Sequence, residues 1–272
     1  MADFSVLMSL YYKEDPAHLT ACMESLLCQT ALPEQIVIVK DGALTPELEA
    51  VLEGFISRSP QLYTVVTLPE NQGLGLALAA GIPACRNELI ARMDTDDICH
   101  RERFALQLAE FDQNPHLDVC GSHIAEFEGD VTNIVARRTV PLTDSAIKQY
   151  QKRRDGVNHM TVMYKKSKVL EAGNYQSCPL MEDTFLWVRM ILCGATFKNI
   201  DRELVCARVG GAMFSRRGGL AYFKKYRAGR KQVYATGYIS RWDYFSTLAV
   251  QLAVCLMPNR LRGWVFKKLL HR

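Results

Sequence analysis

The fold is decided by a short stretch of sequence, Leu89-Ile90-Ala91-Arg92-Met93-Asp94-Thr95-Asp96-Asp97. Its first five residues predict a buried strand, and three carboxylates follow almost at once. Crowded like charges resist ionising together, and a bound cation removes that conflict. Oxygen ligands suit Mg²⁺ or Mn²⁺, and few protein ligands suffice when a diphosphate supplies the rest. The stretch therefore predicts a metal site at Asp94, Asp96 and Asp97; the alternative is a solvated acidic turn that caps the next helix.

Strand and helix patterns alternate on the N-terminal side of this stretch. The elements predicted there are strands at residues 4–10, 35–39 and 62–68, with helices beginning at Pro16, Pro46 and Gly73. On the C-terminal side, a helix at 101–114 gives way to strand-like segments at 118–128 and 132–140. This alternation predicts an α/β fold with a mostly parallel sheet and helices on both faces, followed by a more mixed second half.

The composition is that of a folded globular protein, with 49% hydrophobic and 23% charged residues among 272. The start of the chain has no basic region ahead of an apolar run, so no secretory signal is predicted. The nine cysteines form no CxxC pair and no Cys/His metal spacing, and their number is odd. Reduced thiols in the cytosol are therefore expected, with several cysteines acting as small hydrophobic side chains.

Charge is divided unevenly along the chain. The net charge is +4, yet residues 215–272 hold 13 Lys and Arg against one acid, Asp243, which makes this tail +12 and the rest −8. Such a split predicts that the tail meets an anionic surface. The expected organisation is a globular domain at 1–214 and a basic helical tail at 215–272.

Two features of the tail favour a membrane surface over nucleic acid. Basic residues lie beside aromatic ones at 216–231 and again at 260–272, which suits a lipid interface, and no nucleic-acid recognition motif accompanies them. The apolar segment 245–257 is about 13 residues long, short of the roughly 20 that a spanning helix needs. We predict an amphipathic tail that lies on the membrane; the alternative is a helical pair packed on the domain with its charges solvated.

In an open parallel sheet, ligands bind beyond the carboxyl ends of the strands. The polar segments in these positions are 9–12, 40–42 and 94–97. Asp41 offers a carboxylate to a nucleobase or a ribose, although Asp-Gly is also a common turn pair. The segment Asn71-Gln72-Gly73-Leu74-Gly75 opens a helix whose N–H groups suit a phosphate, or it is a plain helix start. A dinucleotide fingerprint is disfavoured, because its third glycine position is Leu78.

A second acidic pair, Glu182 and Asp183, precedes the apolar run 185–190, which has a helical pattern. These carboxylates either cap a helix N-terminus or place a general base beside a substrate hydroxyl. His159, at the start of a strand predicted over 160–164, is given a structural role, since the six histidines show no HxxxH or HExxH spacing.

Six segments, taken in order, resemble family 2 glycosyltransferases. They are residues 5–12 (SVLMSLYY), 25–30 (SLLCQT), 36–42 (IVIVKDG), 71–75 (NQGLG), 91–97 (ARMDTDD) and 181–183 (MED). The likeness covers roughly residues 4–210 and is strongest to bacterial capsule, exopolysaccharide and O-antigen enzymes, including the amylovoran biosynthesis type. It implies a GT-A fold, a nucleotide-diphosphate sugar donor that is usually UDP-linked, Mn²⁺ or Mg²⁺, and inversion at the anomeric carbon.

The resemblance also implies a role for each matched position. The residues implied to bind the nucleotide sugar are Ser9, Tyr11, Asp41, Asn71, Gly73, Arg92 and Asp94, with Asp41 on the base. Asp183 would be the general base, with Glu182 beside it. Because Asp97 follows Asp96 directly, the motif can be aligned in two ways, which leaves open which aspartate binds the metal directly. Asp96 is taken as the first ligand, ahead of Asp94 and Asp97. Residues 1–115 would hold the donor, and residues 116–214 the acceptor.

The expected activity is inverting, non-processive transfer from a UDP-sugar to a lipid-diphosphate-linked saccharide in surface polysaccharide synthesis. The protein is expected in the cytoplasm, bound to anionic lipids on the inner face of the inner membrane, without nucleic acid. A single transfer is expected because the QxxRW motif of processive synthases is absent: Tyr238 precedes Arg241-Trp242 where Gln would stand. One alternative, a nucleotidyltransferase, needs a basic Gly-rich loop that 11–15 does not supply. The other, a silent nucleotide-sugar-binding module, is disfavoured by the retained carboxylates.

Overall fold

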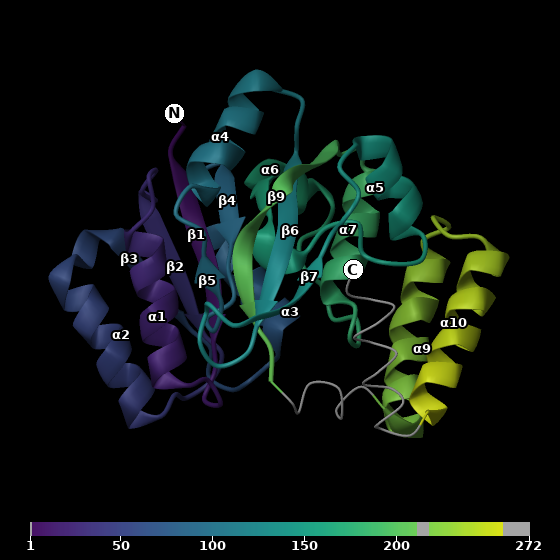
Figure 1. Ribbon diagram of the computed structural model, residues 1–272, viewed down its shortest axis with the longest axis horizontal. Coiled ribbons are helices and arrows are strands. Elements are labelled where there is room, and N and C mark those ends of the chain that lie inside the picture. The colour runs from purple at the N-terminus through teal and green to yellow at the C-terminus, as the bar shows by residue number, and fades with distance from the viewer. Residues whose placement is uncertain (1, 211–217, 258–272) are drawn as a thin grey trace.

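The strands form one central sheet, and helices cover both of its faces (Figure 1). The computed structural model describes residues 2–210 and 218–257, so the expected boundary at 214 and the basic segment 260–272 lie outside the described residues. Within them the strand order is β3-β2-β1-β4-β8-β6-β9-β5, with β7 beside β6. The first four strands of this order are parallel to one another, as predicted for the N-terminal half.

The first half of the chain alternates strands with helices. Its elements are β1 (Phe4–Leu10), α1 (Pro16–Leu27), β2 (Gln35–Lys40), α2 (Pro46–Arg58), η1 (Pro60–Leu62), β3 (Tyr63–Thr67), α3 (Leu74–Ala84), β4 (Leu89–Arg92), β5 (Ile98–Cys99) and α4 (Arg103–Gln113). Local chemistry starts α1 and α2: the Asp15 carboxylate accepts from the Ala17 N–H at 2.7 Å, and the Thr45 hydroxyl accepts from the Leu48 N–H at 3.3 Å. Each helix then begins at a proline, which has no N–H to leave unpaired in the first turn.

The second half mixes parallel and antiparallel pairing. Its elements are β6 (Val119–Phe127), β7 (Ile134–Arg138), α5 (Asp144–Gln151), η2 (His159–Thr161), β8 (Met163–Lys165), α6 (Lys166–Glu171), α7 (Glu182–Leu192), β9 (Phe197–Arg208), α9 (Gly219–Ala235) and α10 (Arg241–Leu256). The strand predicted over 160–164 was wrong at its start, where a 3₁₀ turn stands. Thr161 causes this turn, because its N–H and its hydroxyl both bond back to the Asn158 carbonyl, at 2.9 and 2.8 Å.

Two hydrophobic layers sandwich the sheet. Alternate residues of β1 point to opposite faces, so Val6 and Met8 pack with α1, α2 and α4, whereas Leu7 packs with α3, α6 and α7. The second layer includes Trp187, the largest fully buried side chain. All nine cysteines lie among the described residues without a disulfide, and six of them are buried. Helices on both faces of the sheet are therefore confirmed.

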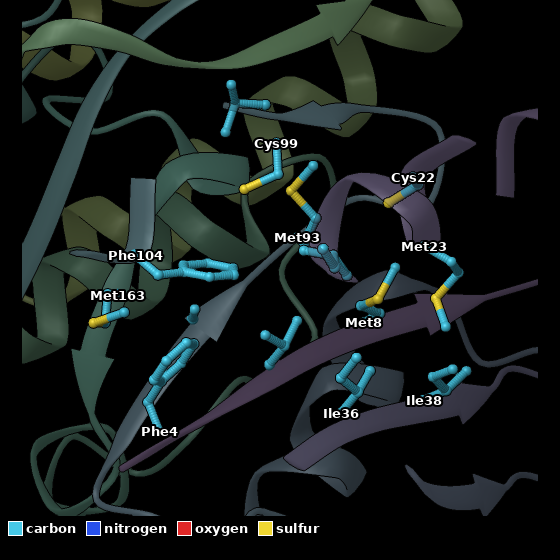
Figure 2. Packing of buried hydrophobic residues seen from close by; sticks show 14 of the residues in the cluster. Phe4, Met8, Cys22, Met23, Ile36, Ile38, Met93, Cys99, Phe104 and Met163 are labelled. Atoms are coloured by element: carbon cyan, nitrogen blue, oxygen red, sulfur yellow. The ribbon is translucent and has the colours of Figure 1, made fainter. Parts of the chain in front are cut away.

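The first of these layers anchors the end of β4. Figure 2 shows Met93 and Cys22 in this cluster of buried residues. The Cys22 thiol donates to the Asp94 carbonyl at 3.2 Å, and the buried Arg103 guanidinium donates to Met93 Sδ at 3.1 Å and to the Arg92 carbonyl at 2.8 Å. The acidic segment after β4 therefore starts from a fixed point in the core.

Helices α9 and α10 form a hairpin beside α7, at the edge of the protein (Figure 1). Val233 and Ile239 of this hairpin pack against Met181 and Val188. Over 218–257 the tail is thus a helical pair packed on the domain, one of the two alternatives; its contact with a membrane stays a prediction. No helix in 2–210 or 218–257 combines the length and apolar character that a membrane crossing requires.

Candidate active site

Asp94 stands directly after β4 and Met93, and its carboxylate is held by a buried arginine. The two terminal guanidinium nitrogens of Arg92 donate to Asp94, Nη1 to Oδ2 at 2.7 Å and Nη2 to Oδ1. Arg92 itself is almost fully buried, and its Nε is a buried atom without a partner among the described residues. Arg92 is thus engaged by Asp94, and its predicted contact with the nucleotide sugar stays a prediction.

Asp97 faces inward, toward the end of β9. Its side chain is 3% exposed, and Oδ1 accepts a hydrogen bond from the Arg208 N–H at 2.8 Å. Burial, followed by the charges of Asp94 and Asp96, raises the pKa of Asp97 well above its usual range. Its Oδ2 has no hydrogen-bond partner within the described part of the chain. Asp97 thus brings to the segment a buried carboxyl that resists ionisation and an oxygen without a hydrogen-bond partner in the described part of the chain.

Asp96 keeps its side chain partly exposed between these two neighbours. Burial raises the pKa of Asp96 to about 6, and the charges of Asp94 and Glu14 add to the rise. Glu14 belongs to the site through its carboxylate, which accepts the Thr95 hydroxyl at 2.8 Å. This packing of acids fits a divalent cation, which would relieve their repulsion and use the orphaned oxygen of Asp97.

The acidic residues at 94–97 suit a cation that takes only some of its ligands from the protein. Across 2–210 and 218–257, no group of three or more His, Cys, Asp or Glu side chains is arranged to hold a metal. Such a cation therefore needs oxygens from a bound diphosphate, as the sequence predicted.

Asp41 ties the end of β2 to the start of α3. Its Oδ1 accepts from the Gln72 N–H at 2.7 Å, and its Oδ2 accepts from the Gly73 N–H at 3.0 Å and from Asn71 Nδ2 at 3.0 Å. Gly42 permits this approach: its φ is +84°, and a Cβ there would lie 2.8 Å from the Asn71 nitrogen. Asp41, Asn71 and Gly73 are brought together, and Asp41 orders the loop whether or not it also binds a base.

The N-termini of α3 and α7 meet beside this loop. A Cβ on Gly75 would lie 2.8 Å from Glu182 Cβ, so only glycine allows the two first turns to pack this closely. At the end of β1, Ser9 is partly buried and Tyr11 is exposed, with its ring 5.9 Å from that of Tyr12. The structure thus gathers the predicted donor residues at the carboxyl ends of β1, β2 and β4.

Asp183 lies inside the first turn of α7, and neither it nor Glu182 is the cap, which is Met181. Its Oδ1 accepts the Thr184 N–H at 2.7 Å, and its side chain is 25% exposed. Burial raises the pKa of Asp183 to about 7, and the charges of Asp155 and Glu182 add to the rise. An acid with that pKa can hold or release a proton near neutrality, as a general base must.

His159 has the structural position that was predicted for it. Its Nδ1 is 4.0 Å from Asp183 Oδ2, and its Nε2 shares a 2.8 Å hydrogen bond with the Tyr175 hydroxyl. Burial lowers the pKa of His159 well below its usual range, so the ring is neutral and supplies no positive charge to Asp183.

The two acidic groups share one buried neighbourhood. Arg92 pairs with Asp94 and also lowers the pKa of Asp183, and the charges of Asp94 and Asp183 both act on the Tyr175 hydroxyl. Residues that are far apart in sequence thus flank a common centre.

Three residues at this centre were not predicted. Glu14 follows the first strand, and the rule about carboxyl ends of strands was sufficient to find it. Arg208 donates through Nε to the Asp96 carbonyl at 3.1 Å, and Asp155 accepts the Thr184 hydroxyl at 2.6 Å. No local pattern marks these two, because their partners come from distant segments.

A sequence model of Glycosyl transferase family 2 matches residues 5–170. The chain belongs to this family. The resemblance is thereby confirmed, and the protein is a glycosyltransferase. The alternative of a nucleotidyltransferase is set aside.

Two relatives of the family 2 protein match it over nearly their whole length. The amylovoran biosynthesis glycosyltransferase AmsE of Erwinia amylovora is 36% identical over 269 residues, covering 97% of this chain and 98% of that protein. The UDP-Gal:alpha-D-GlcNAc-diphosphoundecaprenol beta-1,3-galactosyltransferase of Escherichia coli is 32% identical, covering 99% and 97%. These are bacterial polysaccharide glycosyltransferases, the type that the sequence resembles.

A solved structure confirms the GT-A fold. The mannosyltransferase PcManGT of Pyrobaculum calidifontis, in complex with GDP-Man and Mn²⁺, superposes with a TM-score of 0.64 at 14% identity. The match covers 96% of this chain and 74% of that one. At this identity the likeness concerns the fold alone.

Proposed function

We propose that the protein is an inverting, non-processive glycosyltransferase that moves a sugar from a UDP-sugar to a lipid-diphosphate-linked saccharide. The observation that carries this proposal is that Arg92 pairs with Asp94 and also lowers the pKa of both Asp96 and Asp183, so the two acidic groups lie near one buried arginine. One group suits the leaving diphosphate, and the other suits the attacking hydroxyl. The UDP-galactose donor and diphosphoundecaprenol-linked acceptor in the name of the Escherichia coli relative support the choice of substrates.

In this mechanism the protein supplies a general base, an arginine that holds the Asp94 carboxylate, and a loop beside the donor. Ionised Asp183 takes the proton of the acceptor hydroxyl, which attacks the anomeric carbon on the face opposite the leaving group. Arg92 keeps Asp94 in place and favours the ionised form of Asp183. A divalent cation, Mn²⁺ or Mg²⁺, bound first by Asp96 with Asp94 and Asp97 beside it, would neutralise the charge that grows on the diphosphate. Asp41 holds the loop at 71–75 in place beside the donor by accepting the Gln72 and Gly73 N–H groups.

The test is donor turnover by the full-length protein. A panel of UDP-sugars is incubated with a lipid-diphosphate-GlcNAc mimic, with Mn²⁺, Mg²⁺ or EDTA, and UDP release is measured. We expect metal-dependent release with one donor, and a product whose anomeric configuration is opposite to that of the donor by NMR. Metal-dependent UDP binding without release for any acceptor would instead indicate a silent binding module. Absence of UDP binding with every metal would overturn the proposal.

We further propose that the hairpin of α9 and α10 seats the enzyme on the inner face of the inner membrane, where a lipid-linked acceptor is held. From Trp242 to Leu256 the exposed residues of α10 are all apolar, and most recur at helical spacing: Trp242, Phe245, Ala249, Val250, Ala253 and Leu256. The only charged residue between 242 and 257, Asp243, is buried and paired with Arg153. Exposed basic residues stand on α9, namely Lys224, Lys225, Arg227 and Lys231. An apolar stripe beside a basic one suits an anionic lipid surface.

Vesicle sedimentation tests this seat. We expect the protein to bind vesicles with anionic phosphatidylglycerol more tightly than neutral ones, and the double variant Lys224→Ala/Lys225→Ala to bind them roughly 30-fold more weakly, at about 1 kcal/mol per basic residue. Trp242→Ser/Phe245→Ser should weaken binding to both kinds of vesicle. Leu32→Ser is the control, since Leu32 is 62% exposed and lies outside the hairpin, in the segment that follows α1. Vesicle binding that is insensitive to both double variants would contradict the proposal.

A further inference from the structure

The loop at residues 152–155 lies between the hairpin and the first turn of α7. On the hairpin side, Arg230 of α9 donates to the Lys152 carbonyl, and Arg153 donates through Nε to Asp243 of α10 at 2.7 Å. On the other side, Asp155 reaches α7. The loop is therefore fixed at both ends, although it has no regular secondary structure of its own.

Asp155 connects this loop to the first turn of α7. Its Oδ1 accepts two hydrogen bonds, from the Thr184 hydroxyl at 2.6 Å and from Gln151 Nε2 at 3.0 Å. Gln151 is buried and accepts the Gly156 N–H at 2.8 Å, which closes the loop around Asp155. Thr184 is buried as well, and its own N–H donates to Asp183. One continuous set of hydrogen bonds thus runs from Gln151 through Asp155 and Thr184 to Asp183.

We propose that Asp155 is a positioning residue for sugar transfer: it holds Thr184, and with it the first turn of α7, so that the Asp183 carboxylate faces the acceptor hydroxyl. This inference rests on the role of Asp183 as general base. Asp155 also places a second negative charge beside that base.

The charges around Asp183 define what the loss of Asp155 would do. Asp155 and Glu182 make Asp183 harder to ionise, whereas Arg92 makes it easier. Three other titratable groups near it are uncharged around neutrality: His159 is buried and neutral, and burial raises the pKa of Tyr175 well above its usual range and that of Cys178 to about 12. Removing the charge of Asp155 therefore makes Asp183 a stronger acid and a weaker base.

Two substitutions separate the effect of the Asp155 charge from the effect of its hydrogen bond to Thr184. Asp155→Asn keeps an oxygen for Thr184 and Gln151 but removes the charge, so the acidic limb of the kcat–pH profile should move down by roughly one pH unit. Thr184→Val removes the hydroxyl but keeps the charge, so kcat should fall about 10-fold at every pH without a comparable shift, and Thr184→Ser should restore it. Asp112→Asn, at an exposed position of α4, is the control for charge removal and should leave the profile unchanged.

A second readout does not depend on turnover. In a carbon-13 NMR titration, the Asp183 carboxyl resonance, identified by its absence in Asp183→Asn, should titrate at lower pH in Asp155→Asn than in the parent. If this shift occurs while no UDP-sugar is turned over, the positioning inference keeps its physical basis and the proposed function fails. If the resonance and the kcat–pH profile of Asp155→Asn coincide with those of the parent, or Thr184→Val retains full kcat, the inference is overturned.

Discussion

The Asp183→Asn variant is expected to lose transfer activity, with kcat falling by roughly 10²–10⁴-fold, the usual contribution of a general base. The amide oxygen can still accept the Thr184 N–H, so the first turn of α7 keeps its geometry. What the amide lacks is the ability to take a proton. Donor binding, measured as the Kd for UDP with Mn²⁺, should stay within about threefold of the parent. A variant that retains full kcat would remove Asp183 from the mechanism.

The same substitution has a consequence for stability, and its sign follows from the raised pKa. The pKa of Asp183 is about 7 in the folded protein, against roughly 3.9 for an exposed aspartate. The folded state therefore binds this proton more tightly than the unfolded state, and the resulting stability is lost as pH rises from about 4 through 7. The loss is on the order of 2 kcal/mol, moderated by the partial exposure of the side chain.

Urea unfolding at pH 5 and at pH 8 measures this difference. The parent should lose more free energy of unfolding between these two pH values than Asp183→Asn, which has no proton to release at this position. Over the same range the kcat of the parent should rise and level off above pH 8, because only ionised Asp183 acts as a base. Equal pH dependence of stability in the two proteins would show that Asp183 has an ordinary pKa.

The second large effect is expected from Asp96→Ala. Loss of the partly exposed carboxylate should weaken metal-dependent UDP binding and reduce kcat/KM by about 10²-fold or more, as removal of a group that stabilises developing charge does. The matched variant is Asp97→Asn. Because burial raises the pKa of Asp97 well above its usual range, the neutral amide resembles the form that the site holds without a cation.

Calorimetric titration of UDP with and without Mn²⁺ compares the two variants. We expect Asp96→Ala to lose the metal-dependent part of binding and Asp97→Asn to keep most of it. Asp96→Ala should also unfold at higher urea concentration than the parent in the absence of metal, since one of the repelling charges is gone. The reverse ranking, with binding lost in Asp97→Asn and kept in Asp96→Ala, would make Asp97 the direct metal ligand in place of Asp96.

Much of the fold could be predicted because its signals are local. The N-terminal strands showed short buried runs, and α1 and α2 showed a cap followed by proline at the first position. The prediction failed at residues 160–161, where apolar composition indicated a strand. There the Thr161 hydroxyl donates to the Asn158 carbonyl, and this local hydrogen bond competes with strand pairing. Hydrophobic periodicity carries no information on such a bond.

The site was predictable only in part. Asp94, Asp96 and Asp97 follow a buried strand, and Asp183 precedes a helical run, so both groups were visible as acids in suitable positions. Their surroundings were not visible. Asp155 bonds to Thr184, next to Asp183, from a loop that the hairpin holds through Arg153. Neither contact has a signature within a few residues of either partner.

By itself, the sequence determined the order of strands and helices and the polar residues that follow each strand, because periodicity and caps depend on neighbouring residues. Tertiary structure alone decided that Arg92 holds Asp94, that Asp97 turns inward to Arg208 and that Asp155 bonds to Thr184 next to Asp183. The physical reason is that burial and distance set how strongly charges interact. Both are properties of segments that meet only when the chain is folded.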